Sequence, residues 1–178
     1  SDVLIGLVIA NEETWPQLKE ATYDLGQRAS PDDCFLTLRG LRTLGVRLQR
    51  HQQSALTVAK WLHARPEVKR VLYPALESDP GHALWKRDFR GSSGLFGVEL
   101  EPCTRGQVAA LMDHCEHFGI GYSWGGFESL VVPANLRHGR QVRPWDGGPL
   151  IRLHIGLEDP ADLMADLDVA LARWRAAA

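Results

Sequence analysis

Residues 150–159 read LIRLHIGLED, and this stretch predicts a buried strand that presents two polar side chains. Successive side chains of a strand point to opposite faces, so Arg152 and His154 share one face, opposite three apolar neighbours. An arginine on a core strand is costly unless it has a partner, and its planar guanidinium suits a carboxylate. The pattern fits a carboxylate-bearing substrate, and it also fits a structural ion pair with Glu128 or Glu158. His154 is more typical of a hydrogen-bonded core histidine than of a catalyst.

The strand at 150–155 belongs to a series of short elements that begins after Pro66. The expected elements are strands at 68–73, 94–100, 119–124, 129–132 and 150–155, and helices at 80–89, 104–117 and 161–174. A loop rich in Gly, Pro and Arg fills residues 135–149. The order β, α, β, α, β, β, β, α predicts an α/β fold in which helices cover one face of a small, mostly antiparallel sheet.

The first residues of the chain show a different pattern, a continuous run of apolar residues. Residues 3–10 read VLIGLVIA, an apolar run typical of a strand that is buried on both faces. A strand needs neighbours, and none precedes this one, so we expect its sheet to lie outside the sequence. Asn11 is expected to cap a helix that extends to about residue 29.

Ser30 starts the sequence SPDD, which predicts the beginning of a long helix. Serine is a favoured N-cap, proline fits the first turn, and two acids suit the positive end of the helix dipole. Apolar residues then recur at spacings of three, four or seven up to Pro66. The pattern predicts a helix of about 30 residues, well above the usual length, that could bend or break at Gly40 and Gly45.

The composition is that of an ordinary globular chain. Apolar residues make up 44% of the 178 positions, charged residues 24%, and the net charge is −2. No basic stripe or membrane-length apolar run occurs, so we expect neither a nucleic-acid nor a membrane partner. Three cysteines without paired spacing indicate free thiols and a cytoplasmic location. His114, Cys115 and His117 do not form a complete ligand set, so no metal is expected.

A second motif, GYSWGGFESL at residues 121–130, combines two glycines with an aromatic and hydroxyl cluster. The glycines Gly125 and Gly126 would let the backbone approach a ligand closely. Tyr122, Ser123 and Trp124 would then offer an aromatic wall beside a hydroxyl, which suits a pocket for a small polar ligand. The alternative is a glycine-assisted turn between strands with a packed tryptophan.

Several stretches together resemble, in order along nearly the whole chain, the Cys/Met-metabolism (trans-sulfuration) family of pyridoxal-phosphate (PLP) enzymes of fold type I. The matching segments are SD at 1–2, LRGLRTL at 38–44, YPAL at 73–76, LWKRDF at 84–89, GSSGLF at 91–96, YSWGG at 122–126 and IRLHIGLED at 151–159. The forms SWGG and RLHIGLED look like the cystathionine β-lyase branch. The γ-synthase and γ-lyase branches usually carry leucine at the position of Trp124 and another residue at that of His154.

The resemblance implies roles for individual residues. Arg152 matches the arginine that grips the substrate α-carboxylate, and Ser123 is expected to help hold that group. Trp124 is expected to line the pocket for the substrate side chain, and Tyr122 to form the edge of that pocket.

The resemblance also implies a division of the chain and a position for the cofactor. Residues 1–29 would end the large PLP-binding domain, 30–65 would form a connecting helix, and 66–178 would form the C-terminal substrate-recognition domain. In the family the PLP lysine precedes a Gly-His-Ser-Asp stretch, and this chain starts at its Ser-Asp. The lysine and most PLP contacts would therefore precede Ser1. The lysines Lys19, Lys60, Lys69 and Lys86 stand in no matching context, so no catalytic residue is expected here.

The intact enzyme implied by the resemblance cleaves L-cystathionine by α,β-elimination to homocysteine, pyruvate and ammonia, as a homotetramer built from two-chain active-site units. Residues 1–178 would be inactive alone. The alternatives are a non-catalytic domain that binds a partner chain or an amino-acid carboxylate, a related γ-synthase or γ-lyase, and a cysteine-S-conjugate β-lyase. The residues of this chain that contact PLP, and the preference between cystathionine and cystine, are left open.

Overall fold

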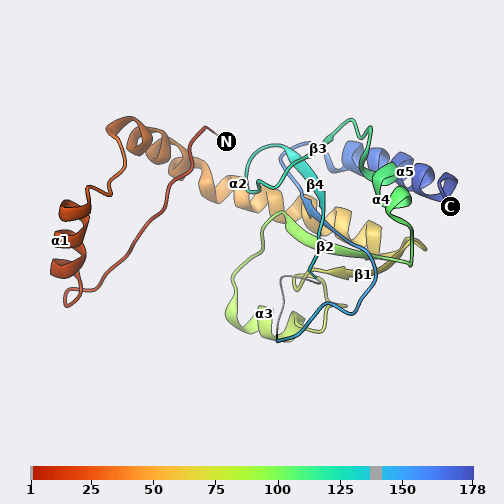
Figure 1. The fold of residues 1–178 in the computed structure, drawn as a ribbon, viewed down its shortest axis with the longest axis horizontal. Coiled ribbons are helices and arrows are strands. Elements are labelled where there is room, and N and C mark those ends of the chain that lie inside the picture. The colour runs from red at the N-terminus through yellow and green to blue at the C-terminus, as the bar shows by residue number, and fades with distance from the viewer. Residues whose placement is uncertain (1, 137–141) are drawn as a thin grey trace. The chain divides into compact units, whose positions relative to one another are not determined.

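The computed structural model describes residues 2–136 and 142–178 (Figure 1). Contacts between residues divide the chain into two compact units, residues 1–45 and residues 46–178. Ser1 of the SD motif, and residues 137–141 of the loop expected at 135–149, lie outside the described residues.

In the first unit, the strand expected at residues 3–10 does not form. A strand is stable only when neighbouring strands satisfy its backbone N–H and C=O groups, and no described strand pairs with this run. None of its apolar residues is buried, and Leu4 is fully exposed and Ile9 94% exposed. Helix α1 spans Trp15–Leu25 and is shorter than the helix expected from Asn11, whose side chain accepts a hydrogen bond from the Thr14 N–H in the turn before it.

Helix α2, Pro31–His63, confirms the long helix expected after the SPDD sequence. The Ser30 hydroxyl accepts a hydrogen bond from the Asp33 N–H at 3.1 Å, as an N-cap does. The helix is continuous, so the break considered at Gly40 or Gly45 does not occur. All of its buried residues belong to the second unit: His51, Ser54, Ala55, Val58, Ala59 and Leu62.

The second unit contains a five-stranded sheet in the order β1-β2-β5-β4-β3. The strands are β1 Val68–Leu72, β2 Leu95–Leu100, β3 Phe118–Ile120, β4 Ser129–Pro133 and β5 Leu150–His154, and the helices after α2 are α3 His82–Asp88, α4 Arg105–Met112 and α5 Pro160–Ala176. Neighbouring strands are antiparallel except for the parallel pair β3 and β4. The expected element order and sheet type are confirmed.

Two elements of the second unit end four or five residues earlier than the sequence pattern indicates. The strand expected at 119–124 stops at Ile120, which leaves residues 121–124 free to form a loop. The helix expected at 104–117 stops at Met112, and His114 follows with a left-handed backbone at φ 67°. The helix does start as expected, because Thr104 and Gln107 form a reciprocal capping box.

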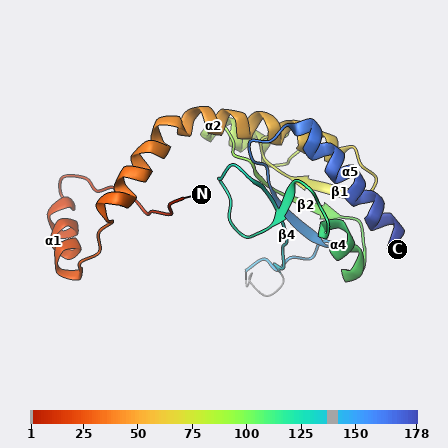
Figure 2. The ribbon, with the colours of Figure 1, turned by 90° about the horizontal axis from the view of Figure 1, so that it is seen from above.

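The core of the second unit lies between the sheet and its helices. The part of α2 that belongs to the second unit, residues 46–63, and helix α5 run along one side of the sheet, as Figure 2 shows, and α4 packs beside α5. Leu153 and Ile155 point to this side and are fully buried, together with Val58 of α2 and Leu163 of α5. Each such side chain contributes about 1.5–3 kcal/mol by leaving water. Because β5 is central in the sheet, burial of one face fixes Arg152 on the other.

Candidate substrate-binding site

Arg152 lies in the middle of β5, in register with Gly97 of β2 and Val132 of β4. Its Nη2 donates a hydrogen bond to the carbonyl oxygen of Tyr122 at 2.6 Å. The same atom lies 3.4 Å from the carbonyl oxygens of Gly121 and Ser123. The Nε atom is buried and has no hydrogen-bond partner among the described residues. The half-buried guanidinium therefore keeps a hydrogen-bond donor that no described residue engages.

No carboxylate of the chain neutralises this guanidinium within the described residues. The Glu158 carboxylate instead accepts hydrogen bonds from the Ser129 N–H at 2.7 Å and the Ser129 hydroxyl at 2.9 Å. No ion pair joins Arg152 to Glu128 or to Glu158. Three carbonyl oxygens and the Tyr122 ring, whose centroid lies 6.0 Å from Cζ, surround the positive charge without cancelling it. The arrangement can bind a carboxylate through charge-assisted hydrogen bonds.

The β3–β4 loop, residues 121–128, brings the other candidate residues to Arg152. Arg152 holds the loop through backbone oxygens, so its contact with Ser123 is to the carbonyl group. The side chains of Tyr122 and Trp124 are 76% and 62% exposed. Gly125 has φ +85°, which confirms a glycine-assisted turn. Trp124 is not packed in a core, so the packed-tryptophan alternative does not describe this loop.

His154 is the second polar residue on the Arg152 face of β5, and it contacts the same loop. Its Nε2 lies 3.1 Å from the Gly125 N–H nitrogen and 3.2 Å from the Gly126 carbonyl oxygen. The ring of His51, from α2, packs against it edge to face at 5.4 Å. Burial lowers the pKa of His154, although the Gly126 carbonyl opposes that shift, and burial also lowers the pKa of His51. Both rings are therefore held in the neutral form.

The far end of the β3–β4 loop is fastened by the segment after β5. The Leu157 N–H donates to the Phe127 carbonyl oxygen at 2.8 Å. The Gly156 N–H donates to the Ser129 hydroxyl, which itself bonds Glu158. A Cβ at Gly156 would lie 2.1 Å from the Phe127 oxygen. The sequence shows the glycine but not this close approach, because Phe127 and Gly156 are far apart along the chain.

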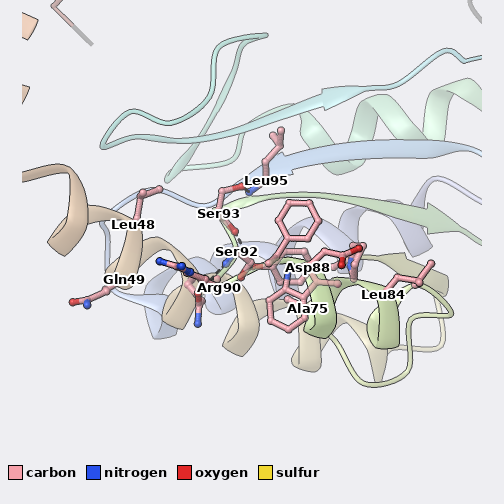
Figure 3. A pocket seen from close by; sticks show the side chains of 16 residues that line it. Leu48, Gln49, Ala75, Leu84, Asp88, Arg90, Ser92, Ser93 and Leu95 are labelled. Carbon is pink, nitrogen blue, oxygen red and sulfur yellow. Dashed lines mark hydrogen bonds between the residues drawn. The ribbon is translucent and has the colours of Figure 1, made fainter. Parts of the chain in front are cut away.

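A cavity of about 820 Å³ lies between α2, α3 and the start of β2 (Figure 3). Leu48, Leu84 and Leu95 line it, with Ser92 and Ser93 on the segment that enters β2. That segment is held by Gln52, which accepts from the Ser92 N–H at 2.9 Å, and by the Tyr73 hydroxyl. The cavity includes neither Arg152 nor the β3–β4 loop, so it is distinct from the candidate site.

The remaining polar candidates do not build a second reactive centre. No group of three potential metal ligands occurs among the described residues. Burial raises the pKa of Cys115 to about 11, so its thiol stays protonated and unreactive. Lys69 pairs with Glu99 at 3.0 Å, and the other three lysines lie on α1, α2 and α3. The described site therefore fits a carboxylate ligand and offers no amine that would hold PLP.

The fold and the site define an α/β domain whose central strand presents an unpaired arginine beside a glycine-rich loop. The chain belongs to the Cys/Met metabolism PLP-dependent enzyme family, which matches residues 1–172. It is 51% identical to a putative cystathionine beta-lyase of Rhizobium johnstonii and 49% identical to the cystathionine beta-lyase of Haemophilus influenzae, each over 97% of this chain. It is also 46% identical to an L-alanine/L-glutamate racemase of Wolbachia pipientis, again over 97% of this chain and 44% of the relative.

Solved structures of relatives share the fold. A cystathionine gamma synthase from Xanthomonas oryzae, 38% identical, matches 94% of this chain with a TM-score of 0.83. An O-acetylhomoserine sulfhydrylase from Wolinella succinogenes, 29% identical, matches 88% with a TM-score of 0.72. These matches cover 45% and 42% of the solved chains, and the first two curated relatives are covered over 44% and 45% of their length. The chain thus spans less than half the length of its relatives.

Proposed function

We propose that a full-length protein containing this chain is a PLP-dependent carbon–sulfur lyase that converts L-cystathionine to homocysteine, pyruvate and ammonia by α,β-elimination. The observation that carries this proposal is the half-buried guanidinium of Arg152, which among the described residues forms no ion pair and whose Nε–H has no hydrogen-bond partner. An amino-acid α-carboxylate is the ligand whose shape and charge suit it. The similarity to cystathionine beta-lyases over 97% of the chain supports the choice of substrate.

Each candidate residue then has a defined task in binding. Arg152 receives the α-carboxylate, while the Tyr122 carbonyl keeps the guanidinium in one orientation. The Ser123 hydroxyl assists in holding the carboxylate. Trp124 lines the pocket for the part of the substrate beyond the α-carbon, and Tyr122 closes its edge, which limits access of water.

PLP supplies the electron sink that such an elimination requires. Since the described site offers no lysine to hold PLP, we propose that residues 1–178 alone do not catalyse the reaction. Visible absorbance of the purified chain after addition of PLP tests this. A stable adduct on one of its four lysines would contradict the proposal.

The test of the carboxylate role is Arg152→Ala in the full-length protein. Loss of a charge-assisted hydrogen-bonded pair costs about 1.5–3 kcal/mol, so KM for cystathionine should rise about tenfold to a hundredfold. Arg65→Ala is the matched control, because Arg65 forms a partly exposed pair with Asp168 away from the β3–β4 loop. An unchanged KM in Arg152→Ala would remove Arg152 from this role.

The choice of β-elimination is tested at Trp124. If this side chain sets which carbon–sulfur bond breaks, Trp124→Leu should increase the products of γ-elimination relative to pyruvate and homocysteine. An unchanged product ratio would leave Trp124 as a contact residue only. Conversion of L-alanine or L-glutamate to the D-enantiomer, without pyruvate, would instead favour the racemase that the Wolbachia relative represents.

We also propose that the full-length protein is a cytoplasmic homotetramer. The three cysteines are free in the structure, as is usual in a reducing compartment. Within the described residues no helix is both long and apolar enough to cross a membrane. Light scattering of the full-length protein measures the assembly directly, and a monomer would contradict this proposal.

A further inference from the structure

The β3–β4 loop carries three of the four proposed substrate-binding residues, yet its own side chains do little to hold it in place. Tyr122, Trp124 and Phe127 are each at least 60% exposed. A loop without buried apolar anchors keeps one shape only if its backbone is bonded to something rigid. Its position must therefore come from the hydrogen bonds that reach it from β5 and from the segment after β5.

Three groups supply those bonds, and they are spaced along the loop. Arg152 contacts the carbonyl oxygens at its start, and Leu157 bonds Phe127 near its end. Between them, only the ring of His154 reaches the Gly125–Gly126 turn among the described contacts. This middle contact matters most for the residues just before the turn, because Trp124 lies between Ser123, the last residue whose carbonyl oxygen Arg152 contacts, and the His154 contact.

The ring of His154 is itself firmly placed. The residue is 1% exposed, and it sits in β5 in register with Leu95 of β2 and Leu130 of β4. A Cβ on Gly94 would lie 3.2 Å from ring atoms of His154, so that side has no spare room. His51 covers the ring edge to face. Among the described residues His51 Nε2 has no hydrogen-bond partner, so its contact with His154 is one of packing.

We propose, building on the function proposed above, that His154 is a positioning residue: its Nε2 fixes the Gly125–Gly126 turn and thereby holds Ser123 and Trp124 beside the Arg152 guanidinium. One ring nitrogen takes one role at a time. The neutral ring therefore either accepts from the Gly125 N–H or donates to the Gly126 carbonyl. Either bond ties the same turn to β5.

The test compares three substitutions in the full-length protein. His154→Gln places a donor and an acceptor near the position of Nε2, so it should keep KM for cystathionine within about threefold of the parent. His154→Leu fills the space without a hydrogen bond. His154→Asn places its amide near the position of Nδ1, which lies 3.5 Å from the Gly125 nitrogen, at the limit of a hydrogen bond, whereas Nε2 lies at 3.1 Å. Both should raise KM about tenfold, with a smaller change in kcat, since binding rather than chemistry is disturbed.

A second measurement reports on the loop without any enzymatic activity. The exposed Tyr122, Trp124 and Phe127 are potential chymotrypsin sites, and cleavage of a loop requires that it leaves its ordered form. In the full-length protein, cleavage at residues 122–127, mapped by mass spectrometry, should be about tenfold faster in His154→Leu and His154→Asn than in His154→Gln. His117→Leu, an exposed histidine outside this loop, is the control and should match the parent protein.

The outcomes separate this proposal from the proposed function. Parent-like KM and cleavage in both His154→Leu and His154→Asn would overturn the positioning role. A His154→Gln protein as impaired as His154→Leu would also overturn it, because the hydrogen bond would then not be what matters. If Arg152→Ala leaves KM unchanged while His154→Leu still accelerates cleavage, the positioning role stands and the substrate assignment falls.

Discussion

The two units of this chain contain similar fractions of apolar residues, but they bury them to very different extents. In residues 46–178, apolar side chains from α2, the sheet, α4 and α5 meet in one buried cluster. In residues 2–45, no residue is buried, and large apolar side chains such as Phe35 and Leu41 are more than half exposed. An apolar pattern therefore predicts that a segment needs burial. Within the described residues, burial occurs only where other helices or strands of the chain face that segment.

The sharpest test of this comparison is a matched pair of leucine truncations in residues 1–178. Leu153 is fully buried at the centre of the sheet, whereas Leu41 on α2 is 51% exposed. Leu153→Ala should lower the free energy of unfolding by about 3 kcal/mol, through lost burial and the cavity that remains. Leu41→Ala should change it by less than about 0.5 kcal/mol. Denaturant titration measures both, and equal losses would mean that the first unit has a core of its own.

Most of the second unit could be predicted from its sequence, because periodicity reports which faces need burial. Alternation in β5 placed Arg152 opposite the core. In the first unit, the SPDD sequence placed the start of α2. The apolar run at residues 3–10 has the same signature as a buried strand, yet the signature does not supply the strands it would pair with. The assignment of residues 1–29 to a large PLP-binding domain stays a prediction.

The site was predictable only in part. Residue type and strand register pointed to Arg152 and the loop at 121–128. Whether a glutamate would neutralise Arg152 depends on tertiary distances, and the structure engages Glu158 with Ser129 instead. The contact between His51 and His154 joins a helix and a strand that are remote in sequence, so no local pattern could indicate it. The roles of Arg152, Ser123, Trp124 and Tyr122 stay predictions.

A matched pair of glycine substitutions sharpens the comparison further. A Cβ at Gly156 would meet the Phe127 carbonyl oxygen at 2.1 Å and a carboxylate oxygen of Glu158 at 2.4 Å, whereas a Cβ at Gly45 would meet nothing within 4 Å. Gly156→Ala should therefore cost about 2 kcal/mol, as overpacking does. Gly45→Ala in the middle of α2 should instead add about 0.5–1 kcal/mol to helix stability.

Thermal unfolding followed by circular dichroism reads out both glycine variants. A parent-like melting temperature in Gly156→Ala would show that the segment after β5 can shift to accept a methyl group at little cost in free energy. It would then not be the rigid anchor for the β3–β4 loop that the structure indicates.

The smallest expected difference between the two units is how their stability responds to acid. Burial holds the pKa values of His51 and His154 below the usual 6.5. Near and below that pH, the unfolded chain therefore binds more protons than the folded chain. The contribution of these two histidines to the free energy of unfolding should be constant above that pH and should fall as the pH drops below 6.5. Residues 1–45 contain no histidine, and carboxylates titrate mainly below about pH 5, so the helicity of α1 should not change with this step.

The double variant His51→Leu, His154→Gln isolates the cause of that acid sensitivity. Without the two buried imidazoles, the decline in unfolding free energy between about pH 6.5 and about pH 5.5 should flatten. The exposed histidines would remain in this variant, so an unchanged slope would assign the effect to them. It would also mean that the two rings accept protons in the folded state. In that case the bond to the Gly125–Gly126 turn would be made by a charged ring, which can only donate, and the Gly126 carbonyl would be its sole partner.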